Sequence, residues 1–291
     1  MKYSFLLIIL LSLGMTSAKD RPAYQIFNKK GKKADFSTMM QAAGKADVVL
    51  FGEIHNNTLV HWLQLQVSKE LLNNGPVVMG AEMFETDDQL VVNEYLQGTI
   101  QERHFENEAK LWNNYQTDYK PLIQFAQTHQ VPFIATNIPR RYASLVARKG
   151  TKALDSLSSA AKKYFAPLPL EVDYELPGYQ NMMSMMGNGM GHSGGGMDPK
   201  NFVNAQAIKD ATMAWSINNN LGKEAVFLHL NGSYHSDNYE GIYWYLKKLN
   251  EELDIITISS VEQSDIGQLD EEHRNKADFI ICTPADMAKS Y

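Results

Sequence analysis

Short apolar runs alternate with helix-like segments along most of the 291-residue chain, and this alternation restricts the fold more than any other feature. Runs this short suit buried strands better than helices. The runs are residues 48–51, 77–81, 132–135, 225–230, 255–258 and 279–282. The pattern predicts an α/β fold with a mostly parallel central sheet and flanking helices, in which the carboxyl ends of the parallel strands meet at one edge.

The segments between these runs carry apolar residues at helical spacing. The clearest are residues 59–72, 140–149, 203–220 and 241–253. One of two helix-rich stretches, about 87–130 or 152–220, is expected to form a smaller helical subdomain over the carboxyl edge of the sheet. The net charge of -6 argues against a nucleic-acid-binding surface, because such a surface must be basic.

The first 18 residues have the three parts of a secretory signal peptide. Lys2 supplies the positive charge, residues 5–13 are almost wholly apolar, and small residues lead to Ala18. The apolar run is far shorter than the roughly 20 residues that span a bilayer. We therefore expect a signal peptide over 1–18, one α/β domain over 19–291, and export to the periplasm or cell envelope.

The only cysteine is Cys282, so this chain has no lipobox cysteine near the cut to carry an acyl chain. A single cysteine also excludes an intramolecular disulfide and argues against a cysteine-based zinc site.

A Met- and Gly-rich segment at about 179–197 interrupts the alternation, with His192 in its midst. Glycine disfavours an ordered helix, so the sequence predicts a mobile loop. Three interpretations stay open: a solvated linker, a copper site built from thioethers, or an adaptable apolar flap over a large planar ligand.

Two Gly-x-x-His motifs follow directly after apolar runs. The first, at 52–55, contains Glu53 and His55, and the second, at 232–235, contains Tyr234 and His235. If both strands are central and parallel, the two imidazoles meet in one crevice at the carboxyl edge. Either motif alone is a weak signal, and any one of these polar residues alone is more often a cap or a surface group.

Other strand ends add polar groups to the same edge. Glu82 follows the second run, and Asn137, Arg140 and Arg141 follow the third. Two His, two Glu and an Arg suit a metal site, acid–base catalysis or an anionic cofactor equally. The candidate metal ligands are Glu53, His55, Glu82 and His235.

The other histidines are expected to play no part in this site. His229 lies inside a strand and is interpreted as a core residue. His61, His104, His129 and His273 fall on helices or surface loops without a pairing that would make them ligands. The tripeptide Asn56-Asn57-Thr58 matches the sequon for N-glycosylation, but it is interpreted as the start of a helix.

In the order and spacing of these strand-end motifs the chain resembles the ChaN-like haem-binding uptake proteins, which are grouped with Tiki, TraB and erythromycin-esterase-like proteins. The matching stretches are 51–55, 80–84, 137–141 and 232–235, with a further likeness over 112–126. The resemblance extends over about 46–258. It implies an α/β sheet with a smaller helical part, and haem carried at the cell envelope for iron acquisition.

The resemblance also implies haem held between two protomers by a tyrosine ligand, in contact with outer-membrane haem-uptake machinery. No motif identifies that tyrosine. The candidates are Tyr115, Tyr119, Tyr142, Tyr174, Tyr179 and Tyr234. The residues expected to contact haem are His55, Arg140, Arg141, Tyr234 and His235, with the arginines pairing with propionates. Family members are typically lipoproteins, which this chain, lacking a lipobox cysteine, does not match.

Three functions therefore remain as hypotheses. The first is an exported haem-binding protein, expected to be a homodimer. The second is a metal-dependent hydrolase in which Glu53, His55, Glu82 and His235 hold a divalent metal or activate water, and Arg140 stabilises the developing anion. The third is a copper-handling protein that uses the Met-rich segment.

Overall fold

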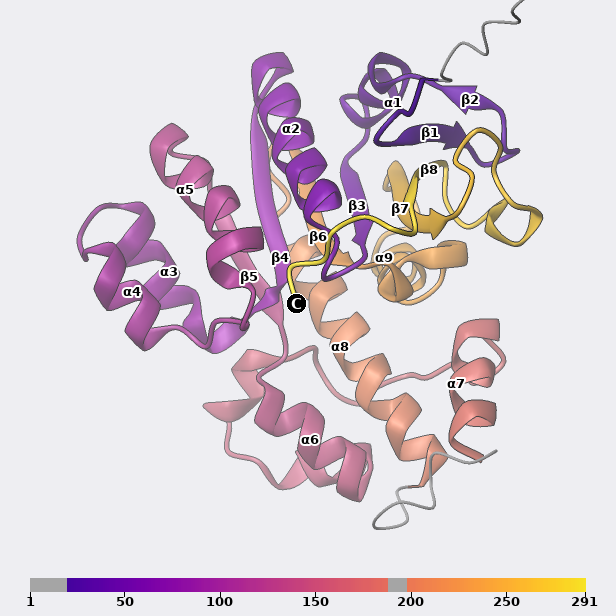
Figure 1. Ribbon diagram of the computed structural model, residues 1–291. Coiled ribbons are helices and arrows are strands. Elements are labelled where there is room, and N and C mark those ends of the chain that lie inside the picture. Colours follow the sequence, from indigo (N-terminus) through magenta and orange to yellow (C-terminus); the bar gives the residue numbers. More distant parts are fainter. Residues whose placement is uncertain (1–19, 188–197) are drawn as a thin grey trace, which may run out of the picture.

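The computed structural model describes residues 20–187 and 198–291, so the expected signal peptide at 1–18 lies outside the described residues. An eight-stranded sheet runs through the described part in the order β2-β1-β8-β7-β3-β6-β4-β5 (Figure 1). The strands are β1 (Gln25–Asn28), β2 (Lys33–Ala34), β3 (Val48–Glu53), β4 (Val77–Glu85), β5 (Phe133–Asn137), β6 (Val226–Gly232), β7 (Ile255–Gln263) and β8 (Phe279–Pro284). From β8 to β5 all neighbours are parallel, which confirms the expected α/β fold.

The short antiparallel pair β1–β2 extends the sheet beyond β8 and was not predicted. Its strands are four and two residues long, too short for a periodic signal.

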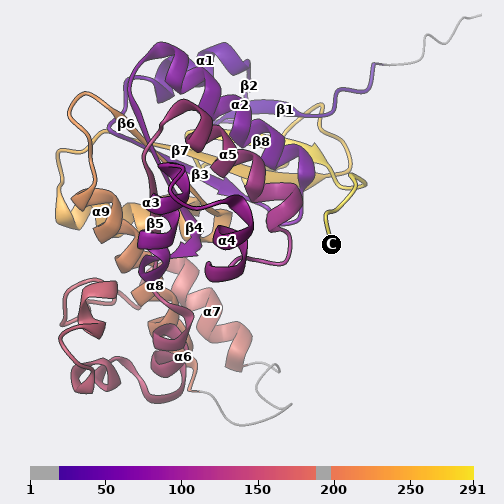
Figure 2. The same ribbon diagram turned by 90° about the vertical axis from the view of Figure 1, so that its left-hand side faces the viewer.

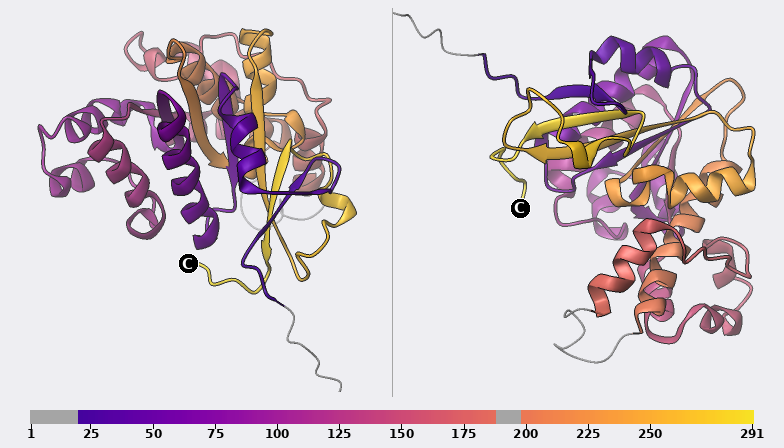
Figure 3. Two further views of the ribbon diagram at one scale, coloured as in Figure 1. Left: turned by 90° about the horizontal axis from the view of Figure 1, so that it is seen from above. Right: turned by 90° about the vertical axis from the view of Figure 1, so that its right-hand side faces the viewer.

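Helices cover both faces of the sheet (Figures 2 and 3). They are α1 (Phe36–Ala43), α2 (Thr58–Asn74), α3 (Gln89–Leu96), α4 (Glu102–Glu108), α5 (Lys120–His129), α6 (Arg140–Lys149), α7 (Pro177–Gly187), α8 (Pro199–Asn219) and α9 (Ile242–Leu249). A hydrophobic core lies on each face of the sheet, and alternate residues of β3 point into one or the other. Val49 and Phe51 pack with α1, α2 and α5, whereas Val48 and Leu50 pack with α8 and α9. None of the helices in these two described ranges is long and apolar enough to cross a bilayer.

A smaller group of helices lies beyond the carboxyl edge of the sheet, where α6 and α7 pack against α8 (Figure 1). The expected loop at 179–197 is wrong for its first half, because α7 continues to Gly187. Tyr179, Met182 and Met183 recur at helical spacing and pack in the α8–α9 core, which outweighs the glycines that follow. The rest of the segment, 188–197, lies outside the described residues.

The parallel pairing of β3 with β6 places the two Gly-x-x-His motifs side by side. Gly52 is in register with Asn231, and Glu53 with Gly232. A Cβ atom at Gly52 would lie 2.8 Å from the Cα of Ser233, so this close approach requires glycine.

We expect Gly52→Ala to destabilise the fold by about 1–3 kcal/mol, because the added methyl group meets backbone that cannot move aside. Gly75→Ala is the matched control: its backbone is extended and a Cβ there meets nothing within 4 Å. Urea unfolding of both variants measures the difference. Equal stabilities would show that the two motifs are not held together by this contact.

Candidate functional site

The first histidine of the site is paired with the carboxylate that precedes it. Glu53 ends β3 and is 1% exposed. Nδ1 of His55 lies 2.9 Å from its Oε1 atom, and the side chain of His55 is 35% exposed. With Nδ1 directed at Glu53, Nε2 lies on the other side of the ring next to Gly232, where a Cβ atom on that glycine would come within 2.7 Å of it.

Neighbouring side chains fix the Glu53 carboxylate. The Tyr119 hydroxyl donates to Oε1 at 2.6 Å, and the Gln64 amide donates to Oε2 at 2.6 Å. Burial raises the pKa of Glu53, but the charges of His61 and His55 and the hydrogen bonds from His55 and Tyr119 outweigh burial and lower the pKa below its usual value. Glu53 is therefore an anion that orients the His55 ring.

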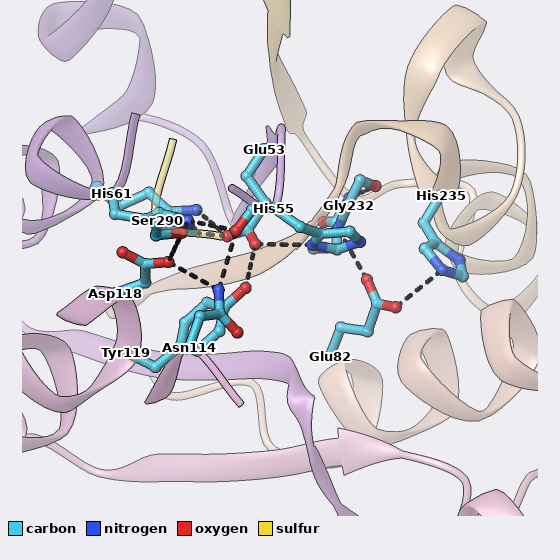
Figure 4. A network of polar contacts seen from close by, with 12 residues as sticks. Glu53, His55, His61, Glu82, Asn114, Asp118, Tyr119, Gly232, His235 and Ser290 are labelled. Atoms are coloured by element: carbon cyan, nitrogen blue, oxygen red, sulfur yellow. Dashed lines mark hydrogen bonds and ion pairs between the residues drawn. The ribbon is translucent and has the colours of Figure 1, made fainter. Parts of the chain in front are cut away.

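His61 belongs to the same network, which corrects the expectation that it has no pairing. It is 4% exposed on α2, with Nδ1 3.0 Å from Oε1 of Gln64 and Nε2 3.0 Å from the carbonyl oxygen of His55. His61 and Gln64 stand three residues apart on the buried side of α2. Figure 4 shows His61 together with Glu53 and Tyr119.

The second histidine lies between two carboxylates. His235 is 5% exposed; its Nε2 lies 3.1 Å from Oε1 of Glu82, and its Nδ1 contacts Oδ1 of Asp210. Glu82 also accepts the Gly232 backbone N–H at 2.7 Å, and Asp210 accepts the Tyr179 hydroxyl at 2.7 Å.

These two carboxylates set the charge of His235. Burial lowers the pKa of the ring, but the charges of Glu82 and Asp210 outweigh burial and raise the pKa of His235 to about 10. The pKa of Glu82 is likewise held far below its usual range, against the effect of its burial, by His235 and His55. Each ring nitrogen of His235 faces a carboxylate oxygen, an arrangement that favours a ring carrying protons on both nitrogens at neutral pH.

The four candidate metal ligands thus form two pairs, Glu53–His55 and Glu82–His235. Within residues 20–187 and 198–291, three or more His, Cys, Asp or Glu donor atoms lie within 4.8 Å of one another only at Asp270, Glu272 and His273. These lie elsewhere, around a short turn before β8. His229 is a core residue as expected, fully buried between Thr136 and Asn231.

The remaining candidates lie around this centre. Arg140 begins α6 and is exposed, with no ion pair to any described residue. Arg141 is exposed but paired with Asp87 at 2.6 Å. Tyr234 is 44% exposed and donates to the carbonyl oxygen of Gly178 at 2.8 Å. Asn57 is fully buried and caps α2, as the helix-start interpretation predicted.

A cavity of about 760 Å³ opens at the carboxyl ends of β4 and β5; His55 does not line it but contacts two residues that do, Trp112 and Asn114. Its lining includes Lys110, Leu111, Trp112, Arg140, Arg141 and Tyr291. The rings of Trp112 and His55 meet edge to face with centroids 5.0 Å apart, and the Asn114 amide donates to the His55 carbonyl oxygen at 2.9 Å. The volume lies within the roughly 300–1,000 Å³ of cofactor and ligand pockets.

A protein-family model described as "Haem-binding uptake, Tiki superfamily, ChaN" matches residues 39–246, which contain both Gly-x-x-His motifs. The chain belongs to this ChaN family. A comparison with curated protein sequences gives no match at the significance threshold.

Solved structures with the same fold include a ChaN of Campylobacter jejuni described by its cofacial haem binding. It is 18% identical at a TM-score of 0.66, covering 90% of this chain and 97% of its own. A succinoglycan biosynthesis protein is 12% identical with a TM-score of 0.52, and the match covers 90% of this chain and 94% of that protein. A Bacillus cereus protein is 9% identical with a TM-score of 0.51, and the match covers 90% of this chain and 95% of that protein. At these identities the likenesses show the fold that this ChaN-family chain shares with them.

Several residues of this ChaN-family site were not recognised in the sequence: His61, Gln64 and Asp210. Asp210 lies on α8 between the buried residues Ala207 and Ala211. A charged residue among apolar positions of a helix was a signal that it has a buried partner. Tyr119 was considered only as an iron ligand, whereas the structure shows it bound to Glu53.

Tyr119→Phe is expected to lower the free energy of unfolding by about 1.5–3 kcal/mol, because it removes a hydrogen bond to a buried carboxylate. Tyr115→Phe is the matched control. The Tyr115 hydroxyl is buried and has no hydrogen-bond partner among the described residues, so its loss costs nothing or stabilises the protein. Denaturant unfolding compares the two, and equal losses would contradict the Glu53 network.

The charge of His235 predicts a loss of stability in alkali. Its folded pKa lies above the ordinary 6.5, so its contribution is complete below about pH 6.5 and disappears as pH rises through about 10. The free energy of unfolding should fall by up to about 1.4 kcal/mol per pH unit between these values. Asp210→Asn should lower the free energy of unfolding by about 3 kcal/mol at pH 7. It should also make that free energy fall less steeply as the pH rises towards about 10.

Asp155→Asn is the control for that substitution, because Asp155 is exposed and its side chain has no hydrogen bond to any residue that the structure describes. Urea unfolding from pH 6 to 10, with histidine titration by NMR, makes the measurement. A neutral His235 ring at pH 7 would overturn this assignment of charge.

Proposed function

We propose that the chain binds ferric haem non-covalently at the carboxyl edge of its sheet and takes part in haem uptake at the cell envelope. The observation that carries the proposal is the ChaN-family match over residues 39–246. That span includes every residue of the site from Glu53 to His235 and most of the residues that line the cavity beside it.

The chemistry of the cavity residues fits a haem. Trp112 and Leu111 provide apolar surface for the ring, and Arg140, which has no ion pair in the described chain, provides a cation for a propionate. Lys110 is already bound to Asp87 and Asp88, and Arg141 to Asp87, so these cations are largely neutralised. Bound haem would supply a ferric iron that takes an axial donor from the protein.

Among the predicted donors, His55 has the strongest support. Its Nδ1 is held by Glu53, its ring is partly exposed, and it contacts Trp112 at the cavity. A carboxylate on the second nitrogen strengthens a histidine ligand. His235 is 5% exposed and has a carboxylate oxygen at each ring nitrogen, so it offers a donor less readily than His55 does.

The tyrosines lack these features. Tyr119 and Tyr179 are buried and hydrogen-bonded to carboxylates. Burial raises the pKa of the Tyr115 hydroxyl well above its usual value, which disfavours the tyrosinate form. Tyr174 donates to Asn204, and Tyr142 lies beneath Arg141. Tyr234 is accessible, but its hydroxyl is directed at Gly178 rather than at the cavity.

Dimerisation and export belong to the same proposal. The cavity is bounded by exposed residues such as Arg140 and Tyr291, so a planar ligand would keep one face uncovered in a single protomer. A second copy of the chain would cover that face, in keeping with the cofacial haem of the Campylobacter jejuni relative. The expected signal peptide supports delivery to the envelope, where outer-membrane uptake machinery would be the partner.

Titration of the mature protein with ferric haem should give a saturable shift of the Soret band. Arg140→Ala should weaken binding by roughly three- to tenfold, since a partly exposed charged contact contributes about 1 kcal/mol. Arg148→Ala, an exposed cation at the other end of α6, should leave binding unchanged. His55→Ala should move the Soret maximum, whereas Tyr234→Phe should not.

The oligomeric state is measured in parallel by light scattering with and without haem, where a dimer is expected in the haem-bound sample. Absence of a saturable shift in the wild-type protein would refute haem binding. A Soret shift in Tyr234→Phe, with His55→Ala unchanged, would reassign the axial donor.

A further inference from the structure

Residues 288–291, here called the C-terminal strap, cross the carboxyl edge of the sheet next to the loop that carries His55. Figure 1 shows the yellow tail running from β8 past the lower end of α2, and Figures 2 and 3 show that its end lies at the outside of the molecule. Lys289 forms an antiparallel bridge with Asn57, and the Ser290 N–H donates to the Asn56 carbonyl oxygen at 3.0 Å. The strap therefore pairs with the backbone that follows His55.

Side chains anchor the strap on both sides of this pairing. The Lys289 ammonium contacts the Glu262 carboxylate, which also accepts the Asn57 amide at 2.6 Å. The Ser290 hydroxyl donates to Oδ2 of Asp118 at 2.6 Å. Asp118 is 2% exposed, so this hydrogen bond is made to a buried carboxylate and is of the stronger kind.

The Asp118 carboxylate connects the strap to His55. Its Oδ2 atom also accepts the Asn114 amide at 2.7 Å, and the same amide donates to the carbonyl oxygen of His55 at 2.9 Å. His61 lies 3.6 Å from the same carboxylate oxygen. Figure 4 shows Ser290, Asp118, Asn114 and His61 gathered on the Glu53 side of His55.

Tyr291 follows Ser290 and lines the 760 Å³ cavity together with Trp112 and Arg140. Its side chain is 68% exposed, which leaves most of the ring open to a ligand. The family match ends at residue 246, so the strap is a feature of this chain that the match does not include.

We propose that Tyr291 contacts the bound haem as one wall of the cavity, and that Ser290 is a positioning residue that holds this wall and the His55 loop in place. The inference rests on the proposed haem binding and assigns it two residues outside the matched part of the chain. An aromatic ring at the mouth of the cavity suits contact with the edge or face of a porphyrin.

The test uses four single-substitution variants of the full mature chain, and each variant is titrated with ferric haem. Tyr291→Ala should weaken binding about fivefold or more, while Tyr291→Phe keeps the ring and binds normally. Ser290→Ala should weaken binding about threefold, and Ser290→Thr should restore it because the hydroxyl is kept. Leu249→Ala, an exposed apolar residue at the end of α9, and Ser156→Ala, an exposed hydroxyl bonded to a backbone carbonyl, are the matched controls.

Trypsin supplies a second readout, because the bond after Lys289 lies within the strap. Haem should slow cleavage there in the wild-type protein, and Ser290→Ala should speed it without haem. Wild-type protein that binds haem with no protection at Lys289 and unchanged affinity in Tyr291→Ala would overturn this inference alone. Wild-type protein that binds no haem would overturn the proposed function as well.

Discussion

The parallel register of β3 with β6 decides where every polar group of the site lies. It sets Glu53 opposite Gly232, so each strand delivers its histidine to the same edge of the sheet within a few residues of its last hydrogen bond. Gly52 makes this register possible, since any larger residue would push the backbone of Ser233 away. With the two strands in contact, β4 on the far side of β6 brings Glu82 to the same edge.

Burying this many ionisable groups is costly unless each has a partner, and the structure meets that condition with two separate networks. Glu53 is satisfied by His55, Gln64 and Tyr119. His235 is satisfied by Glu82 and Asp210, each of which accepts a further hydrogen bond. The partners come from α2, α8 and the turn before α5, so the helices on both faces of the sheet serve the site as well as the core.

The strands and most helices could be predicted because each buries apolar residues at a regular spacing, a property of the local sequence. The convergence of Glu53, Glu82 and the two histidines followed from one topological rule, that parallel strands end at the same edge. The partners could not be predicted in this way. Asp210 reaches His235, and Ser290 reaches Asp118, across 25 and 172 residues of chain, and no local pattern encodes such contacts. Helix α7 was missed because the glycines that follow it in the sequence outweighed the helical spacing of Tyr179, Met182 and Met183.

The two histidines of the repeated motif have different environments, and this difference assigns them different roles. His235 is buried and has a carboxylate oxygen at each ring nitrogen. A positive charge on this ring balances the charges of the two buried carboxylates. His55 has a carboxylate at Nδ1 alone and a partly exposed ring beside the cavity. Glu53 also raises the pKa of His55, against the effect of burial, so in the proposed haem complex an iron would compete with a proton for this ring. The repeated motif thus places one histidine within a buried pair of carboxylates and leaves the other partly exposed, which is why the proposed haem binding is assigned to His55.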